Sequence, residues 1–171
     1  MYANVDDFDP SAPQVPVSER PEIDRWVLSE LNTLVKEVTA DFEDYEPTKA
    51  GRLIQTFVID NLSNWHVRLS RKRFWGGGMS QDKLSAYQTL YTCLVTVAQL
   101  MAPIAPFYAD RLYTDLTAGL EDAADSVHLA TFPKADEQVV DKDLERRMEL
   151  AQKVSSMAVS YTHLRAHETS L

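Results

Sequence analysis

Cysteine is nearly absent from this 171-residue sequence, which contains Cys93 alone. A single thiol excludes a disulfide framework and a cysteine-based zinc site, and the apolar helical pattern around Cys93 predicts a small buried side chain in a reducing compartment. Long apolar runs are also absent, since none approaches the about eighteen residues that a membrane-spanning helix needs. The first residues lack the basic and apolar regions of a signal peptide. We therefore expect a cytoplasmic protein without a membrane-spanning segment.

Positive charge is scarce: 17 Lys and Arg residues stand against 26 Asp and Glu residues, for a net charge of −9. Such an acidic chain is expected to avoid nucleic acid unless its positive charge is concentrated in one place. The region from 64 to 75 is such a place, with four cations and no acid. The four cations are Arg68, Arg71, Lys72 and Arg73.

Apolar residues recur through most of the chain at the three- and four-residue spacing of a buried helical face. This spacing predicts helices over residues 19–44 and 48–75, a third from Ser80 to a kink at Pro103 and Pro106, a fourth carrying Phe107 on its apolar face, and a last helix capped by Asp141. Residues 127–133 alternate between apolar and polar and predict a short extended segment. We find no internal repeat. The predicted fold class is all-α, an antiparallel helical bundle.

The ends of these predicted elements define the domain limits. Residues 1–18 are rich in Asp, Pro and Ser and are expected to be an extended connector, with Ser18 as the N-cap of the first helix. The helical domain is then expected to occupy residues 19–158. Gly76, Gly77 and Gly78 should end the helix at Trp75. Because no Gly-Lys-Ser/Thr follows them, they favour a turn over a nucleotide loop.

The last residues of the chain carry its most enzyme-like pattern. His163 and His167 stand four apart with Glu168 beside them, a spacing that places two imidazoles on one helical face as many zinc sites require. Residues 159–169, however, resemble one reading frame of the transposon-end adaptor used in DNA sequencing libraries. We therefore interpret residues 159–171 as a non-native adaptor-derived tail and expect no metal site. A zinc hydrolase that uses these three residues is the alternative.

Cations interleaved with aromatic residues between Asn64 and Trp75 are the strongest candidate for a functional site. Arginine offers forked donors that match phosphate oxygens, and aromatic rings can stack on unpaired bases. The candidate nucleic-acid-binding residues are Asn64, Arg68, Arg71, Lys72, Arg73, Phe74 and Trp75. The alternative is a solvated helix end, where Lys and Arg favour the negative end of the helix dipole.

No catalytic residue is expected. Trp65 and His66 favour structural positions, because His66 has no cysteine or second histidine near it in the sequence. The acidic residues cluster at helix starts and in loops, which is typical of solvated placement. The sequence suggests no Ser/His/Asp arrangement.

Residues 61–75, NLSNWHVRLSRKRFW, resemble the signature helix of the anticodon-binding domain of class I isoleucyl-tRNA synthetases. Further blocks match that family in the same order: 20–28, 87–94, 100–110 and 126–133. The resemblance covers about residues 1–158. Valyl and leucyl relatives share the Ala-Pro-containing block but match the arginine-rich helix less well.

This resemblance implies a fragment of an isoleucine–tRNA ligase that binds the anticodon stem-loop of tRNA as a monomer. The parent enzyme joins isoleucine to tRNA with ATP and Mg²⁺, using catalytic and editing domains whose motifs this chain lacks. We therefore expect the chain alone to be inactive, to need no cofactor of its own, and to act beside a catalytic domain in cis. The alternatives are a non-catalytic helical scaffold that binds an acidic protein surface, and the equivalent domain of a valyl- or leucyl-tRNA synthetase.

Overall fold

The computed structural model describes the backbone of residues 2–168 and the side chains of residues 3–159. Its elements are α1 (Tyr2–Val5), the 3₁₀ turn η1 (Val17–Glu19), α2 (Glu22–Glu43), α3 (Pro47–Thr56), the π-helix η2 (Phe57–Val67), α4 (Arg71–Trp75), α5 (Gln81–Met101), α6 (Pro106–Thr117) and α7 (Lys142–Glu168). No strand occurs within residues 2–168, so the prediction of an all-α bundle is confirmed. Residues Met1–Val140 form one compact unit, and α7 belongs to a second unit that begins at Asp141.

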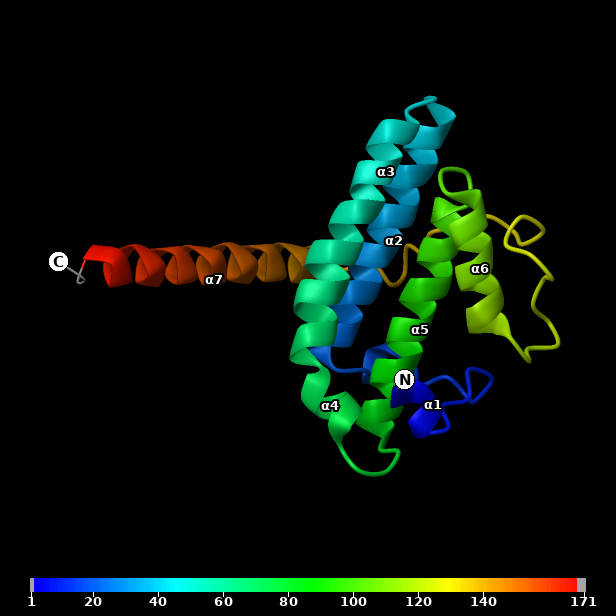
Figure 1. Cartoon of the computed structure of the whole chain (residues 1–171), viewed down its shortest axis with the longest axis horizontal. Coiled ribbons are helices and arrows are strands. Elements are labelled where there is room, and N and C mark those ends of the chain that lie inside the picture. The colour runs from blue at the N-terminus through cyan, green and yellow to red at the C-terminus, as the bar shows by residue number, and fades with distance from the viewer. Residues whose placement is uncertain (1, 169–171) are drawn as a thin grey trace. The chain divides into compact units, whose positions relative to one another are not determined.

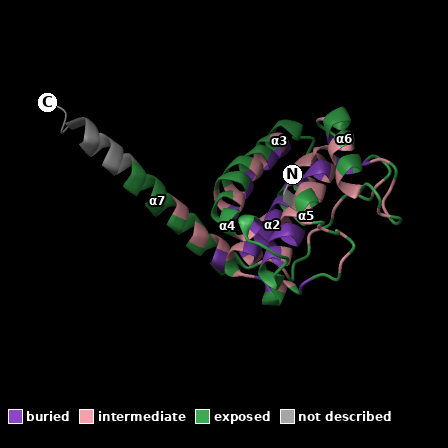
Figure 2. Cartoon of the chain, turned by 60° about the horizontal axis from the view of Figure 1, so that its bottom comes forward, coloured by how far each residue is buried: buried purple, intermediate pink, exposed green. Residues whose placement is uncertain are grey.

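The first unit is a bundle centred on α2. This helix packs against α3 and η2 on one side and against α5 on the other, and α6 packs antiparallel to α5 (Figure 1). The apolar residues that recur along α2 point inward, as their spacing predicts, and the buried positions line the inner faces of the bundle (Figure 2). The buried apolar residues of α2 are Trp26, Val27, Leu28, Leu31, Leu34, Val35 and Val38.

The N-terminal segment differs from the predicted connector because it packs on α5 through buried polar groups. The backbone N–H of Val15 donates to Oε1 of Gln88 at 2.9 Å, and Nε2 of Gln88 donates to the Pro13 carbonyl at 3.0 Å. The buried Arg20 donates from Nε to the Val15 carbonyl and from Nη1 to the Thr89 hydroxyl, both at 2.9 Å. These bonds make the segment part of the bundle.

The first residues of α5 and α2 show which sequence signals predict the start of a helix correctly. The helix predicted to start at Ser80 does so, and Ser80 is its cap, since its Oγ accepts from the Lys83 N–H at 3.1 Å. Ser18 does not cap α2, because it lies within η1 and the N-cap position is Pro21. Proline lacks an N–H, so it adds no unsatisfied donor of its own at a helix start.

The loops between helices confirm the glycine turn and revise two local predictions. Gly78, with φ of +75°, occupies the left-handed region in the turn after α4, a conformation that glycine adopts without steric cost. Phe107 was expected on a buried face of α6, but it is 92% exposed. Residues 127–133 form no strand: a turn covers 127–129, and 131–133 have no regular structure.

The second unit consists of α7 and the residue that caps it. Oδ1 of Asp141 accepts from the Leu144 N–H at 2.9 Å, which confirms the predicted cap. The side chains of His163, His167 and Glu168 lie outside the described residues. Among the described side chains, no group of three His, Cys, Asp or Glu residues could hold a metal ion. Within the same part of the chain, no helix is long and apolar enough to cross a bilayer.

Candidate nucleic-acid interface

The predicted helix over residues 48–75 is not one continuous α-helix. After α3, the backbone widens into η2, where the Arg68 N–H donates to the Ser63 carbonyl, five residues earlier. The chain then breaks at Ser70 before the five-residue α4. A π-helical stretch changes the angular spacing of the residues after it, and such stretches are frequent at functional sites. This change of register accompanies the exchange of apolar for basic residues along this part of the chain.

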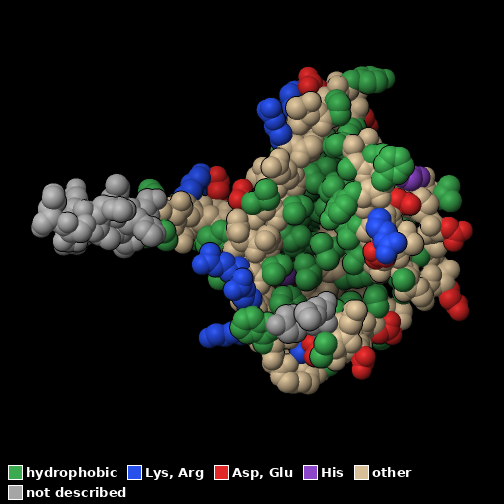
Figure 3. All heavy atoms as spheres, in the orientation of Figure 1, with side chains coloured by type: hydrophobic (Ala, Val, Ile, Leu, Met, Phe, Trp, Pro, Cys, Tyr) green, Lys and Arg blue, Asp and Glu red, His purple; other side chains and the backbone are tan. Residues whose placement is uncertain are grey.

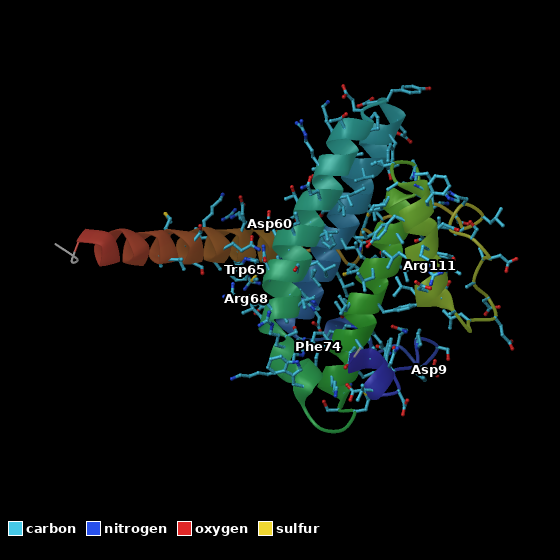
Figure 4. All side chains as sticks on the ribbon, viewed as in Figure 1. Asp9, Asp60, Trp65, Arg68, Phe74 and Arg111 are labelled. Carbon is cyan, nitrogen blue, oxygen red and sulfur yellow. The ribbon has the colours of Figure 1, made fainter. Side chains whose placement is uncertain are left out.

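Five of the candidate residues form an exposed surface on η2 and α4. We call it the basic surface, and its members are Asn64, Arg68, Arg71, Lys72 and Trp75, all of them exposed. The Trp75 side chain is 61% exposed. Lys and Arg side chains gather beside η2 and α4 in the space-filling view (Figure 3), and the labelled Arg68 lies directly after η2 (Figure 4). The basic surface thus combines three cations with one large accessible aromatic ring.

Arg73 points into the bundle, unlike its neighbours on α4. Its Nη1 and Nη2 donate to Oδ1 and Oδ2 of Asp24 at 2.8 and 2.7 Å. Its Nε donates to Oδ2 of Asp82 at 3.0 Å, and Nη2 also donates to the Asp82 carbonyl at 2.8 Å. Because its forked donors are used inside the protein and its side chain is only 15% exposed, we revise the expectation that Arg73 contacts phosphate.

Phe74 is buried as well and offers no face to a nucleic-acid base. Its ring lies 5.1 Å from that of Tyr87, centroid to centroid, in a small apolar cluster with Ala86. Trp65 is half-buried, which agrees with the structural placement that its sequence position favours. Leu69 of the same stretch is exposed, although its side chain is apolar. Of the aromatic residues at positions 74 and 75, only Trp75 is placed to stack on a base.

Asp24 is a fully buried carboxylate that joins three helical segments. It accepts from Arg73 of α4 and from Nε2 of His66 of η2, the latter at 2.9 Å, and both Asp24 and His66 side chains are 0% exposed. Burial alone raises the pKa of Asp24, but the hydrogen bonds from Arg73 and His66 and their positive charge outweigh it, and the pKa is lowered. The prediction that the acidic residues are solvated was therefore wrong for Asp24.

A sequence signal for this site existed in the position of Asp24. It stands three positions before Val27 and seven positions before Leu31, so it falls on the inward face of α2. A charged residue on an apolar face is rarely fully buried unless it is paired. His66 is fully buried beside Asp24, which agrees with the structural position that its sequence context favours. Cys93 is fully buried, as expected, and burial raises the pKa of its thiol.

The lowered pKa of Asp24 predicts an acid-sensitive contribution to stability. The pKa of an unfolded aspartate is about 3.9, and the folded value is lower, so the ionised carboxylate stabilises the fold above pH 4. This contribution is lost as the pH falls below 4 and through the folded pKa. We expect wild type to exceed Asp24→Asn in free energy of unfolding at pH 5, and the gap to narrow toward pH 3. Urea denaturation of both proteins at each pH measures the gap, and a gap that widens in acid contradicts this assignment.

The structure is a helical bundle with an exposed basic surface beside a buried acid, and a family comparison defines the class of protein to which this bundle belongs. The family model for the anticodon-binding domain of tRNA ligase matches residues 24–164, and the chain belongs to this family. This confirms the resemblance found in the sequence blocks.

The chain is similar in sequence to isoleucine–tRNA ligases. The chain is 66% identical over 161 residues to that of Bacteroides thetaiotaomicron, 61% over 160 residues to that of Porphyromonas gingivalis, and 51% over 160 residues to that of Dehalococcoides mccartyi strain CBDB1. These matches cover 94%, 94% and 93% of this chain, but only 14%, 14% and 16% of the relatives' own lengths. The chain therefore corresponds to one domain-sized part of much longer proteins.

Proposed function

We propose that this chain binds the anticodon stem-loop of an isoleucine tRNA, as one domain of an isoleucine–tRNA ligase. The observation that supports this most directly is the basic surface itself. In a chain of net charge −9, Arg68 directly after η2 and the cations Arg71 and Lys72 of α4 are exposed along one short stretch of sequence. Concentrated Arg and Lys side chains attract the phosphate backbone by releasing its counterions, even when the rest of a domain is acidic.

Each member of the basic surface has a distinct proposed role. Arg68, Arg71 and Lys72 hold phosphate oxygens, and arginine does so with its two-pronged guanidinium. The ring of Trp75 stacks on an unpaired base. The Asn64 amide contributes a hydrogen bond to sugar, phosphate or base. Arg73 and Phe74 are left out of this contact set because they are committed to the interior.

The reaction of the parent enzyme is proposed to occur in other domains. Activation of isoleucine with ATP and Mg²⁺ would take place there, and this chain alone would be inactive and monomeric. The domain would act in the cytoplasm and serve to hold the tRNA while a catalytic domain in cis aminoacylates it.

The salt dependence of tRNA binding tests this function. We expect the affinity to fall steeply as salt rises, and Arg68→Ala/Arg71→Ala to weaken binding and to flatten the plot of log K against log[salt]. Each lost phosphate contact lowers the slope by about 0.7 to 0.9. Fluorescence anisotropy with labelled tRNA over a salt series measures both quantities.

A matched control removes the same charge elsewhere. Lys49 and Arg52 are exposed on α3, outside the basic surface. We expect Lys49→Ala/Arg52→Ala to leave the slope nearly unchanged. Salt-insensitive binding, or equal losses in both double variants, contradicts the proposed surface. A scaffold for an acidic protein partner would instead ignore tRNA and bind a polyanionic protein.

A further inference from the structure

The orientation of α4 needs an explanation, because this helix is too short to be stable alone. It has five residues, whereas isolated helices shorter than about twelve residues are marginal in water. The break before it leaves Ser70 with φ of −83° and ψ of 2°, outside regular helix geometry. Tertiary contacts must therefore set the direction in which α4 presents its side chains.

Arg73 supplies polar contacts of this kind from the inward side of α4, in addition to the packing of Phe74 against Tyr87. Its guanidinium binds both carboxylate oxygens of Asp24 on α2, and it also reaches Asp82 at the first turn of α5. The Ser70 hydroxyl, at the break itself, accepts from Nη1 at 3.3 Å. A planar two-pronged contact fixes direction as well as distance, which a single hydrogen bond does not. One side chain thus ties α4 to two other helices.

The same carboxylate also holds the segment on the other side of the break. Oδ1 of Asp24 lies 2.9 Å from Nε2 of His66 on η2, while Nη1 of Arg73 donates to the same oxygen at 2.8 Å. The second ring nitrogen of His66 has no hydrogen-bond partner among the described residues. Asp24 is therefore the contact that orients this ring, and it joins η2 to α4 across Ser70.

We infer that Asp24 and Arg73 are positioning residues for RNA binding: they hold η2 and α4 in the relative orientation that aligns Arg68 with Arg71, Lys72 and Trp75. The inference rests on the proposed function of the basic surface. Neither residue needs to touch RNA, since Asp24 is fully buried and Arg73 nearly so. Their effect on binding is exerted through the geometry of α4.

Charge and geometry predict opposite effects of Asp24→Asn on RNA affinity. Replacing Asp24 with Asn removes a negative charge beneath the basic surface, so long-range electrostatics alone predicts tighter RNA binding. Positioning predicts weaker binding, because the Asn amide offers one acceptor oxygen and a donor NH2 group where the carboxylate offers Nη1 and Nη2 of Arg73 an oxygen each. Arg73→Lys separates the two effects further, since it keeps the charge but loses the fork that spans Asp24.

The experiment uses the full chain and measures tRNA affinity and salt slope at low temperature, where circular dichroism shows that each variant is folded. We expect Asp24→Asn and Arg73→Lys each to weaken binding about tenfold, the equivalent of one charge-assisted contact, and to flatten the slope. Val127→Ala is the control for lost stability, because Val127 is buried in a separate apolar cluster with Ala98, Ala109 and Tyr113. It should lower the melting temperature and leave affinity unchanged.

Unchanged or tighter tRNA binding by Asp24→Asn overturns the inference. So does a loss of tRNA affinity in Val127→Ala, because lost stability alone would then weaken binding. If Asp24→Asn does not fold, the comparison of Arg73→Lys with Val127→Ala decides. The double variant Arg68→Ala/Arg71→Ala distinguishes a failure of the proposed function from a failure of the positioning role. If it binds tRNA normally, the proposed function fails; if it binds weakly while the positioning variants bind normally, only this inference fails.

Discussion

Asp24→Ala is expected to lower the free energy of unfolding by about 3 to 5 kcal/mol, the cost of removing one partner from a buried ion pair. The side chain is 0% exposed and accepts from both Arg73 and His66. Its removal leaves a largely buried guanidinium with half of its carboxylate partners and a buried imidazole without its acceptor. Urea denaturation at pH 7, monitored by circular dichroism, measures the loss.

Asp82→Ala provides the control for this prediction. Asp82 binds the same Arg73 side chain at 3.0 Å, but its own side chain is 52% exposed. Solvent screening reduces the value of such a contact to about 1 kcal/mol or less. Similar losses for the two variants would show that the burial of Asp24 does not determine its contribution.

Phe74→Ala is expected to cost about 3 kcal/mol or more in stability, because it empties an aromatic site in the apolar cluster around Tyr87. The adjacent residue gives a matched comparison. Trp75→Ala removes an exposed ring, so we expect a change in stability within about 0.5 kcal/mol. Its effect should fall on RNA binding instead, with a loss of about 1 to 3 kcal/mol for one stacked base.

Denaturation and tRNA binding measured on both variants separate these roles. We expect Phe74→Ala to lose mainly free energy of unfolding and Trp75→Ala to lose mainly tRNA affinity. A stable Phe74→Ala protein would contradict the burial of that ring. Normal tRNA affinity in Trp75→Ala would remove the proposed stacking contact from the basic surface.

The bundle could be predicted from the sequence because its helices are long and amphipathic. Twenty-two residues of α2 repeat one apolar face, and α5 begins at a serine cap that follows a glycine turn. Such signals are local, so they survive without knowledge of the tertiary structure. The exposed cations Arg68, Arg71 and Lys72 could be identified in the same way, since a dense basic stretch contrasts with an acidic chain.

The burial of Arg73 and Phe74 could not be predicted from their residue types, which favoured contacts with phosphate and bases. Spacing was the better guide, because Arg73 stands nine positions after Asn64, about 180° around a continuous α-helix from it. The π-helical turns of η2 and the break at Ser70 rotate α4 relative to α3, and these features depend on what α2 and α5 offer as partners. The buried acid that receives Arg73 lies far away in the sequence, so no local window contains both.

Gln88 has a consequence for how this domain can be cut from a longer protein. Its amide, 1% exposed on α5, is satisfied by the N–H of Val15, by the carbonyl of Pro13 and by Arg20. A truncation that starts at the first long helix would strand this amide in the core, where each unsatisfied polar group costs about 1 to 3 kcal/mol. The proline-rich stretch has the composition of a dispensable linker, but it covers and satisfies buried polar groups. An expression boundary therefore belongs before it.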